Sequence, residues 1–308
     1  MKLKVWGARG SIPAPGPETM RYGGNTSCVE VTLGDGSTLI LDAGTGIRNL
    51  GLVLPHADRP IHILLTHLHL DHIQGLMFFA PAFWPESEII IWGPASPEAS
   101  LRDRIARYIS APLAPVEVRE LPSLVSFREA EPTEWCIGSA RVRAESVTHR
   151  GPTLGYRIED GDTTLAYIPD HEPGLGAPLA SLEDEWISGF GLAAGASMLI
   201  HDCQYTDQEY PSHVGWGHCP MSEALAFARR VGTERLLLFH HDPMHSDDFL
   251  DTLSGSAADH WRELGGGRGR VELATESREI SLDVASTAGT KVAAQAASPA
   301  ATAVERTD

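Results

Sequence analysis

An apolar run that leads into a dense group of metal-binding side chains constrains this sequence more than any other feature. Residues 61–66 read Ile-His-Ile-Leu-Leu-Thr, which is typical of a buried strand, and residues 67–72 follow at once as His-Leu-His-Leu-Asp-His. A helical pattern begins at Ile73. Imidazole and carboxylate groups at a strand-to-helix turn can converge on one point outside a sheet, and they suit zinc and similar divalent ions. The segment therefore predicts a metal site; solvated loop histidines are the alternative.

Short apolar, β-branched runs bounded by Gly, Pro and Asp recur along the chain and predict strands. They are residues 2–8, 28–33, 38–43, 61–66, 88–92, 140–147, 154–159, 163–168, 197–201, 235–239 and 270–275. Helical periodicity covers residues 73–83, 97–108, 183–194, 222–231 and 247–264, with Ser222 and Ser246 as the expected N-caps. Because both halves mix strands with occasional helices, we expect two packed sheets with helices outside, a four-layer α/β sandwich.

The domain organisation predicted from the sequence is simple. Residues 1–284 contain no linker and are expected to form one domain, whereas residues 285–308 are rich in Ala, Ser and Thr and are expected to be a disordered tail. Residues 7–27 form a long Gly/Pro-rich connection, and such loops are usually functional or mobile. Arg9 in this loop is a candidate for a substrate contact, although an exposed loop charge is the favoured interpretation.

Composition bears on partners and location. The chain has 41 acidic and 24 basic residues and a formal net charge of −17, and such a field repels phosphate backbones. A large nucleic acid is therefore disfavoured as a partner. No signal peptide and no span of about 20 apolar residues is present, so no membrane association is expected. The cysteines form no Cys-x-x-Cys pair, which predicts free thiols in a reducing cytoplasm. Homo-oligomerisation is left open.

The motif Thr-His-Leu-His-Leu-Asp-His at residues 66–72 resembles the signature of the metallo-β-lactamase superfamily. Other parts of that family's pattern follow at the ends of predicted strands, at His149, Asp170 and His240, and an early Asp stands at Asp42 in Leu-Asp-Ala-Gly. The resemblance covers about residues 1–284 and implies the four-layer αββα fold of a metal-dependent hydrolase.

The resemblance also implies a dinuclear metal site. The implied ligands are His67, His69 and His149 for one ion, Asp71, His72 and His240 for the other, and Asp170 between them. His241 is the alternative to His240. Asp42 is implied to order the ligand loop from behind. The implied cofactors are two divalent ions, Zn²⁺ with Mn²⁺ as the alternative.

The segment at residues 215–220 indicates which branch of the superfamily the chain resembles. Gly-Trp-Gly-His-Cys-Pro at residues 215–220 stands where ribonuclease Z and related phosphodiesterases have a catalytic His, although those relatives commonly follow it with Ser or Thr and this chain has Cys219. His149 and Asp170 are 21 positions apart, which leaves no room for the tRNA-gripping arm of ribonuclease Z.

The resemblance thus implies a phosphodiesterase acting on a small-molecule substrate, a small or cyclic phosphodiester. A hydroxide bridging the metals would be the nucleophile, Asp71 would take or orient its proton, and His218 would act as general acid. A thiolesterase or lactonase with the same dinuclear site is one alternative. A non-catalytic protein that only binds metal is the other.

Deleting Ala285–Asp308 is expected to leave the melting temperature and the activity nearly unchanged, because the tail has few large apolar side chains to bury. Thermal unfolding and turnover of the full-length and truncated proteins measure this. A fall of more than about 4 °C, which corresponds to roughly 1 kcal/mol or more for a domain of this size, would mean that the tail packs on the domain.

Overall fold

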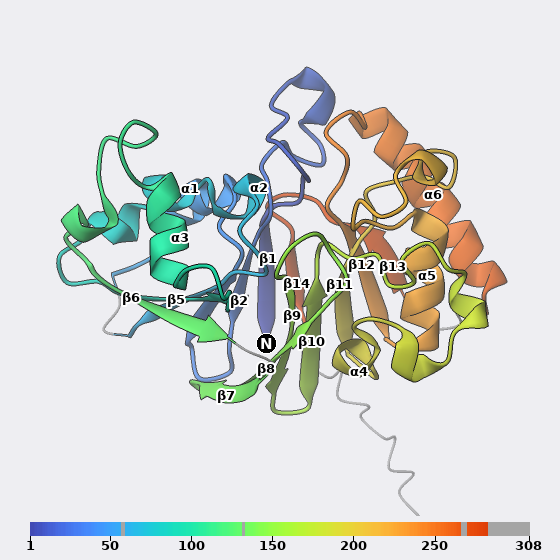
Figure 1. Cartoon of the computed structure of the whole chain (residues 1–308). Coiled ribbons are helices and arrows are strands. Elements are labelled where there is room, and N and C mark those ends of the chain that lie inside the picture. Colours follow the sequence, from blue (N-terminus) through green and yellow to red (C-terminus); the bar gives the residue numbers. More distant parts are fainter. Residues whose placement is uncertain (57–58, 131–132, 266–269, 283–308) are drawn as a thin grey trace, which may run out of the picture.

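The computed structural model describes residues 1–56, 59–130, 133–265 and 270–282. Two seven-stranded sheets lie in the middle of the molecule, with α1 (Gly46–Gly51) and α3 (Leu101–Tyr108) on one side and α5 (Met221–Arg230) and α6 (Asp247–Glu263) on the other (Figure 1). The predicted four-layer α/β sandwich is confirmed. The predicted tail lies outside the described residues, and the domain boundary at residue 284 stays a prediction. In the described part of the chain, no helix has the length and apolarity to cross a membrane.

The first sheet joins the first and last strands of the described chain and carries the predicted ligand loop. Its order is β14 (Glu279–Ser281), β1 (Lys2–Gly7), β2 (Cys28–Thr32), β3 (Thr38–Leu41), β4 (Ile61–Leu64), β5 (Glu88–Pro94) and β6 (Leu124–Ala130). Strands β3 to β6 are parallel, so their carboxyl ends meet at one edge. Asp42 follows β3 at this edge, and residues 66–72 follow β4.

The second sheet delivers the remaining candidate residues to the same edge of the sandwich. Its order is β13 (Arg270–Leu273), β12 (Arg235–Phe239), β11 (Met198–Asp202), β10 (Thr163–Ile168), β9 (Leu154–Asp160), β8 (Ala140–Ser146) and β7 (Thr133–Ile137). Strands β10 to β13 are parallel, and β8 runs with them because β9 is antiparallel to both of its neighbours. His149, Asp170 and His240 follow the carboxyl ends of β8, β10 and β12.

The central strands are apolar throughout because both of their faces are covered. Leu39 and Leu41 of β3 point into the core between the sheets, where they join Tyr156 and Tyr167 of the second sheet. Ile40, between them, points to the opposite face and packs in the core under α1 and α3. This alternation follows from the two-residue repeat of a strand, and it decides which of the two cores each side chain enters.

Two predicted helices are interrupted in the structure. Only α2 (Leu70–Ile73) and the 3₁₀ turns Leu76–Phe78 and Ala80–Phe83 occupy the region predicted as a helix over 73–83. Pro81 cannot donate the backbone hydrogen bond that a continuing α-helix needs. The predicted helix over 183–194 is a 3₁₀ turn at Asp184–Trp186 followed by the single turn α4 (Phe190–Ala193). Helix α4 starts after Gly189, whose φ of 70° is left-handed.

The predicted N-caps had different outcomes. The side chain of Ser246 accepts a hydrogen bond from the backbone N–H of Phe249, so this N-cap of α6 is confirmed. Ser222 is wrong as a cap: α5 begins at Met221 after Pro220, and the Ser222 hydroxyl bonds Asp207 instead. Strands β6, β7 and β14 and helix α1 were not predicted.

The Gly/Pro-rich loop over residues 7–27, drawn in blue at the top of Figure 1, is fixed to the late part of the chain. Arg9 is fully buried. Its Nε donates to the Gly23 carbonyl (2.8 Å), and its Nη1 donates to the carbonyls of Asp242 (3.1 Å) and His245 (2.7 Å). Arg9 is therefore neither an exposed charge nor a substrate contact; it ties this loop to residues 242–245.

Candidate metal centre

The first group of predicted ligands comes together from two loops. His67 and His69 of the ligand loop and His149 after β8 each offer a ring nitrogen, and these atoms lie within 4.8 Å of one another. Nε2 of His149 is 3.3 Å from Nδ1 of His69. A tetrahedral zinc ion bonded at about 2.1 Å needs donor atoms about 3.4 Å apart. The distance between these two nitrogens therefore matches that between two ligands of the same zinc ion.

The second group lies deeper and shares one carboxylate with the first. Oδ2 of Asp170 is 3.7 Å from Nε2 of both His67 and His149, and 3.3 Å from Nε2 of His240. Oδ1 of Asp170 is 3.1 Å from Nε2 of His72. Asp170 thus faces both groups. The atoms of the second group also lie within 4.8 Å of one another: Asp71, His72, Asp170 and His240. Their roles as ligands stay predictions.

The rings of His240 and His241 point in different directions, which decides which of them can be a metal ligand. His240 turns Nε2 to within 3.1 Å of Oδ2 of Asp71. The ring of His241 points the other way, and its Nε2 donates to the Ala274 carbonyl at 2.8 Å. Burial lowers the pKa of His241 to about 3, so its ring is neutral. Only His240 is therefore positioned to contribute to the cluster.

Three of the cluster histidines are held by hydrogen bonds on the far side of the ring. Nδ1 of His72 donates to Oδ2 of Asp42 (2.8 Å), Nδ1 of His149 donates to the Gly217 carbonyl (2.7 Å), and Nδ1 of His240 donates to Oε1 of Gln204 (3.0 Å). Each bond fixes the tautomer and leaves Nε2 facing the cluster, as is usual for metal-binding histidines.

Asp42 organises the ligand loop from the protein interior. It is fully buried, and besides His72 it accepts from the backbone N–H of Thr66 (2.7 Å) and from the Tyr167 hydroxyl (2.9 Å). It therefore joins the start of the ligand loop, one ligand candidate and the second sheet. The loop over residues 7–27 adds a contact from outside: the backbone N–H of Ser11 donates to Oδ2 of Asp71 at 2.7 Å.

The electrostatics of the cluster favour a bound cation. Burial by itself would raise the pKa of Asp170, but His240, His72 and His67 offset it and hold that pKa well below its ordinary range. The same balance, with His72 and His240 as partners, lowers the pKa of Asp71. Burial lowers the pKa of His240, and the nearby carboxylates more than offset this and raise it to about 9. The two carboxylates are thus ionised beside positive charge, which His72 and His240 supply here and which divalent ions at the same donors would also supply.

The donor atoms themselves fit divalent metal. Nε2 of His67 is buried without a hydrogen-bond partner, and burial and His72 hold the pKa of His67 well below its ordinary value, so the ring is a neutral imidazole. A neutral imidazole nitrogen that has no hydrogen-bond partner and lies near an ionised carboxylate is a suitable ligand for a metal ion. The cluster therefore suits divalent ions, which need deprotonated N and O donors.

His218 lies beside the cluster and is hydrogen-bonded to a buried carboxylate. Its Nδ1 donates to Oδ2 of Asp202 at 2.6 Å, and its ring stacks on that of His240 at 4.9 Å. One ring nitrogen lies within 4.8 Å of donor atoms of His149 and Asp170. The side chain of Cys219 turns inward, with Sγ 3.5 Å from the Asp202 carbonyl oxygen. Cys219 therefore does not face the cluster.

Glu172 is a site residue that the sequence reasoning missed. Its carboxylate is fully buried and accepts from the Tyr210 hydroxyl (2.8 Å) and from the backbone N–H groups of Gly215 (2.8 Å) and Gly217 (2.9 Å). Gly217 in turn accepts the hydrogen bond of His149. Gly217 has a φ of 92°, and a Cβ there would lie 2.3 Å from Nδ1 of His149. Glu172 therefore holds the loop that orients His149 and presents His218.

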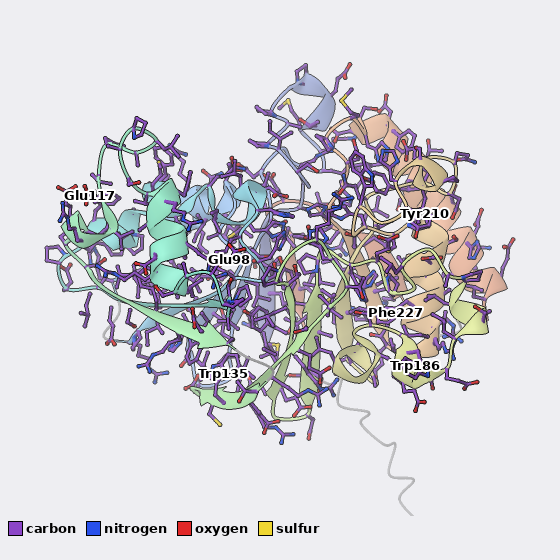
Figure 2. All side chains as sticks on the ribbon, viewed as in Figure 1. Glu98, Glu117, Trp135, Trp186, Tyr210 and Phe227 are labelled. Atoms are coloured by element: carbon purple, nitrogen blue, oxygen red, sulfur yellow. The ribbon has the colours of Figure 1, made fainter. Side chains whose placement is uncertain are left out.

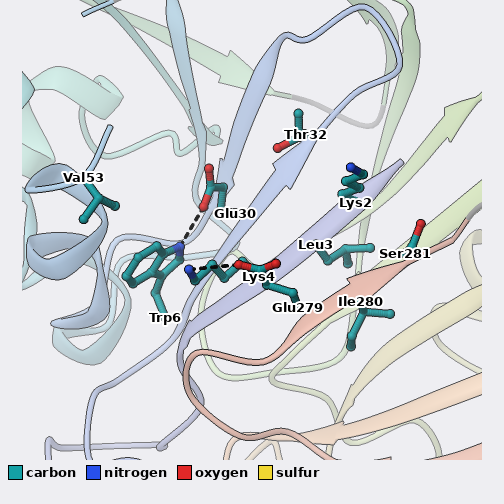
Figure 3. Close-up of a pocket in the computed structure, with 10 residues that line it drawn as sticks. All are labelled: Lys2, Leu3, Lys4, Trp6, Glu30, Thr32, Val53, Glu279, Ile280 and Ser281. Carbon is teal, nitrogen blue, oxygen red and sulfur yellow. Dashed lines mark hydrogen bonds and ion pairs between the residues drawn. The ribbon is translucent and has the colours of Figure 1, made fainter. Parts of the chain in front are cut away.

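A separate hollow of about 510 Å³ lies on the outer face of β1 and β14 (Figure 3). Trp6 donates to Oε2 of Glu30 (2.9 Å), and Nζ of Lys4 lies 3.2 Å from Oε1 of Glu279. None of its lining residues belongs to the metal cluster. This hollow is therefore separate from the edge of the sandwich where the predicted ligands gather.

Known proteins share both the sequence pattern and the fold. A family model described as "Beta-lactamase superfamily domain" matches residues 37–241. A protein of Mycobacterium marinum named Ribonuclease Z is 28% identical over 316 residues, which cover 92% of this chain and 99% of that protein.

Two solved structures have the same fold. The metallo-beta-lactamase fold protein YhfI from Bacillus subtilis is 22% identical, with a TM-score of 0.64 over 91% of this chain and 98% of its own. The short form of human tRNase Z is 21% identical, with a TM-score of 0.64 over 92% of this chain and all of its own.

These relatives correct one expectation. The net charge of −17 was taken to disfavour a large nucleic acid as a partner. That exclusion is wrong, because similar proteins are named Ribonuclease Z. Net charge is a sum over the whole surface, and it does not fix the potential at one site.

Changing His67 and His69 together to Ala is expected to lower the metal content from about two divalent ions per chain to about one or none. Elemental analysis of the purified proteins measures this. A variant with His56→Ala and His260→Ala removes two histidines outside the cluster and is expected to keep the full content. Unaltered stoichiometry in the His67/His69 variant would contradict the ligand assignment.

Glu172→Gln is expected to weaken metal binding by about 10- to 100-fold, because the amide NH₂ would face backbone N–H groups that now donate to the carboxylate. Competition with a chelating dye measures the affinity. Glu223→Gln is the matched control, since Oε2 of this neighbouring carboxylate accepts no hydrogen bond. Equal effects of the two variants would argue against Glu172 as the group that holds the His149 loop.

Proposed function

This chain belongs to the beta-lactamase superfamily and is a metal-dependent hydrolase, and we propose that the bond it hydrolyses is a phosphodiester. The observation that carries the proposal is the pairing of His218 with Asp202 beside the cluster. Cleavage of a phosphodiester expels an alkoxide, which needs a proton, whereas a thiolate can leave without one. An imidazole held beside the cluster is a suitable proton donor.

The proposed cofactors are two divalent ions, zinc by preference and manganese as the alternative. His67, His69 and His149 would hold one, Asp71, His72 and His240 the other, and Asp170 would contact both. Divalent cations bound there would make a water nucleophilic at neutral pH and offset the charge of the phosphate. The carboxylate of Asp71 would accept or orient the proton of that water while its Oδ2 is held by Ser11.

His218 would deliver the other proton. Its Nδ1 is committed to Oδ2 of Asp202, which leaves Nε2 as the atom that can donate to a substrate oxygen. Asp202 is itself fixed, because its Oδ1 accepts from the backbone N–H groups of Gln204 (3.0 Å) and Cys219 (3.3 Å). A buried carboxylate in this position keeps the His218 ring in one orientation.

The proposed substrates are diesters that can reach the cluster. The segment between His149 and Asp170 consists of β9, β10 and the turns that flank them, so it carries no arm of its own for gripping a large substrate. This supports a small or cyclic phosphodiester. RNA belongs in the same tests, because the relatives named Ribonuclease Z cover nearly all of this chain. A reducing, cytoplasmic location is also proposed, in keeping with four free cysteines.

The experiment that tests the proposal compares substrate classes on one protein. The zinc- and manganese-loaded enzymes are assayed with aryl phosphodiesters, a cyclic phosphodiester, an RNA with a 3′ extension, phosphomonoesters, a thioester and a lactone. Hydrolysis of one or more diesters at rates well above the other classes supports the proposal. Preference for the thioester or lactone, or stoichiometric metal without any turnover, would replace it.

His218→Ala is expected to lower phosphodiester turnover by about 10²- to 10⁴-fold while the metal content stays near two, because a proton donor is lost and no predicted ligand is. The loss should be smaller for a p-nitrophenolate leaving group than for an alkoxide, which needs more protonation. Steady-state kinetics with both substrates measure the difference.

The control for this variant is His56→Ala, which removes an exposed histidine paired with Glu86. Equal losses with both leaving groups would mean that His218 positions the phosphate and does not protonate the leaving group. Turnover equal to that of the control would remove His218 from the mechanism.

A further inference from the structure

A second hollow, which we call the Arg150 pocket, opens beside the ligand loop. Its volume is about 390 Å³, and its lining includes His67, His69, Glu98, Arg104 and Arg150. Glu98 lies beside α3 on the side that faces the middle of the molecule (Figure 2). Because two predicted ligands form one wall, a substrate with its phosphorus at the cluster would extend into this pocket.

Arg150 presents a free, oriented guanidinium to the pocket. Its side chain is exposed, and its Nε donates to the Gly215 carbonyl at 3.0 Å. Gly215 belongs to the loop that Glu172 holds, so the guanidinium is anchored to the same element that orients His149. Within the described ranges, no carboxylate forms an ion pair with Arg150, and its two terminal amino groups have no hydrogen-bond partner. Those two groups form a planar fork that matches a phosphate or carboxylate.

The other charges of the pocket are already engaged. Arg104 donates from Nε to the Ala99 carbonyl (3.1 Å) and from Nη2 to the Pro94 carbonyl, and Nη2 lies 3.7 Å from Glu129. Burial lowers the pKa of Arg104, and the charges of Glu129 and Glu98 act against that. Glu98 therefore interacts with Arg104, and Arg150 is the cation of this pocket that lacks a counter-charge.

We infer that the Arg150 pocket is a subsite for a second anionic group, a phosphate or a carboxylate, that the substrate carries beyond the scissile diester. The inference rests on the proposed phosphodiesterase function and narrows its substrate class. In a chain with a net charge of −17, an arginine beside the cluster gives a local attraction for anions. A neutral ester group would leave the guanidinium unused.

The test uses three diesters with one leaving group. Ethyl p-nitrophenyl phosphate has a neutral second ester, and its 2-carboxyethyl and 2-phosphonoethyl counterparts add one anionic group. The readout is the ratio of kcat/KM for each anionic diester to that for the ethyl diester. We expect a ratio of about ten or more in the metal-loaded wild type, shrinking at high salt. In Arg150→Met we expect this ratio to fall about 10-fold or more, to near one.

The matched control is Arg102→Met, which removes an exposed arginine of α3 that does not line this pocket. A ratio near one in the wild type, or an equal fall in Arg102→Met, would overturn the inference. A gain confined to the phosphonoethyl diester identifies a phosphate subsite, and one confined to the carboxyethyl diester identifies a carboxylate subsite. A loop distorted by Arg150→Met would slow all three diesters and leave the ratio as in the wild type, which would also count against the inference.

Calorimetry separates this inference from the proposed function. Ethyl phosphate and 2-phosphonoethyl phosphate are titrated into the metal-loaded wild type and Arg150→Met. If none of the diesters is hydrolysed, the proposed function fails. Tighter binding of 2-phosphonoethyl phosphate that is lost in Arg150→Met would still support an anion subsite, and equal binding of both compounds would overturn it.

Discussion

The crowding of negative charge at one edge of the sandwich is the constraint on which the rest of the structure depends. Asp71 and Asp170 are both buried and lie within a few ångströms of each other among histidine rings. Two ionised carboxylates in such a place are tolerated only beside compensating positive charge. Three further buried carboxylates hold the groups around this pair. Asp42 accepts hydrogen bonds from the ligand loop, and Asp202 accepts one from His218. Glu172 accepts hydrogen bonds from the loop that includes Gly215 and Gly217.

Much of this site is readable from the sequence because its parts are local or fall at strand ends. The ligand loop holds four donor groups in six residues after an apolar strand, so the strand alone fixes where they project. His149, Asp170 and His240 are single residues, and only the family resemblance makes them stand out. Glu172 gives no such signal: besides the Tyr210 hydroxyl, its partners are backbone N–H groups more than forty residues later, and no residue type marks a backbone donor.

The sequence predictions that were wrong or missing failed because the deciding feature was not visible in the pattern used. Helical periodicity over residues 73–83 and 183–194 reports which side chains are apolar, but it does not report breaks in the backbone such as Pro81 in the second 3₁₀ turn and the left-handed Gly189 before α4. Net charge is a sum over the whole surface, so a value of −17 does not exclude a nucleic acid that meets a local cation such as Arg150. Strand β14 is only three residues long, too short to show an alternating pattern.

The burial of Arg9 has a consequence for the order in which the protein can be completed during synthesis. Its guanidinium needs the carbonyls of Asp242 and His245, so the loop over residues 7–27 cannot settle until the ribosome has released residues more than two hundred positions later. That loop reaches Asp71 through Ser11. A nascent chain that has paired only β1 to β6 therefore still lacks a finished centre, and metal acquired before the last strands emerge would meet an incomplete set of donors.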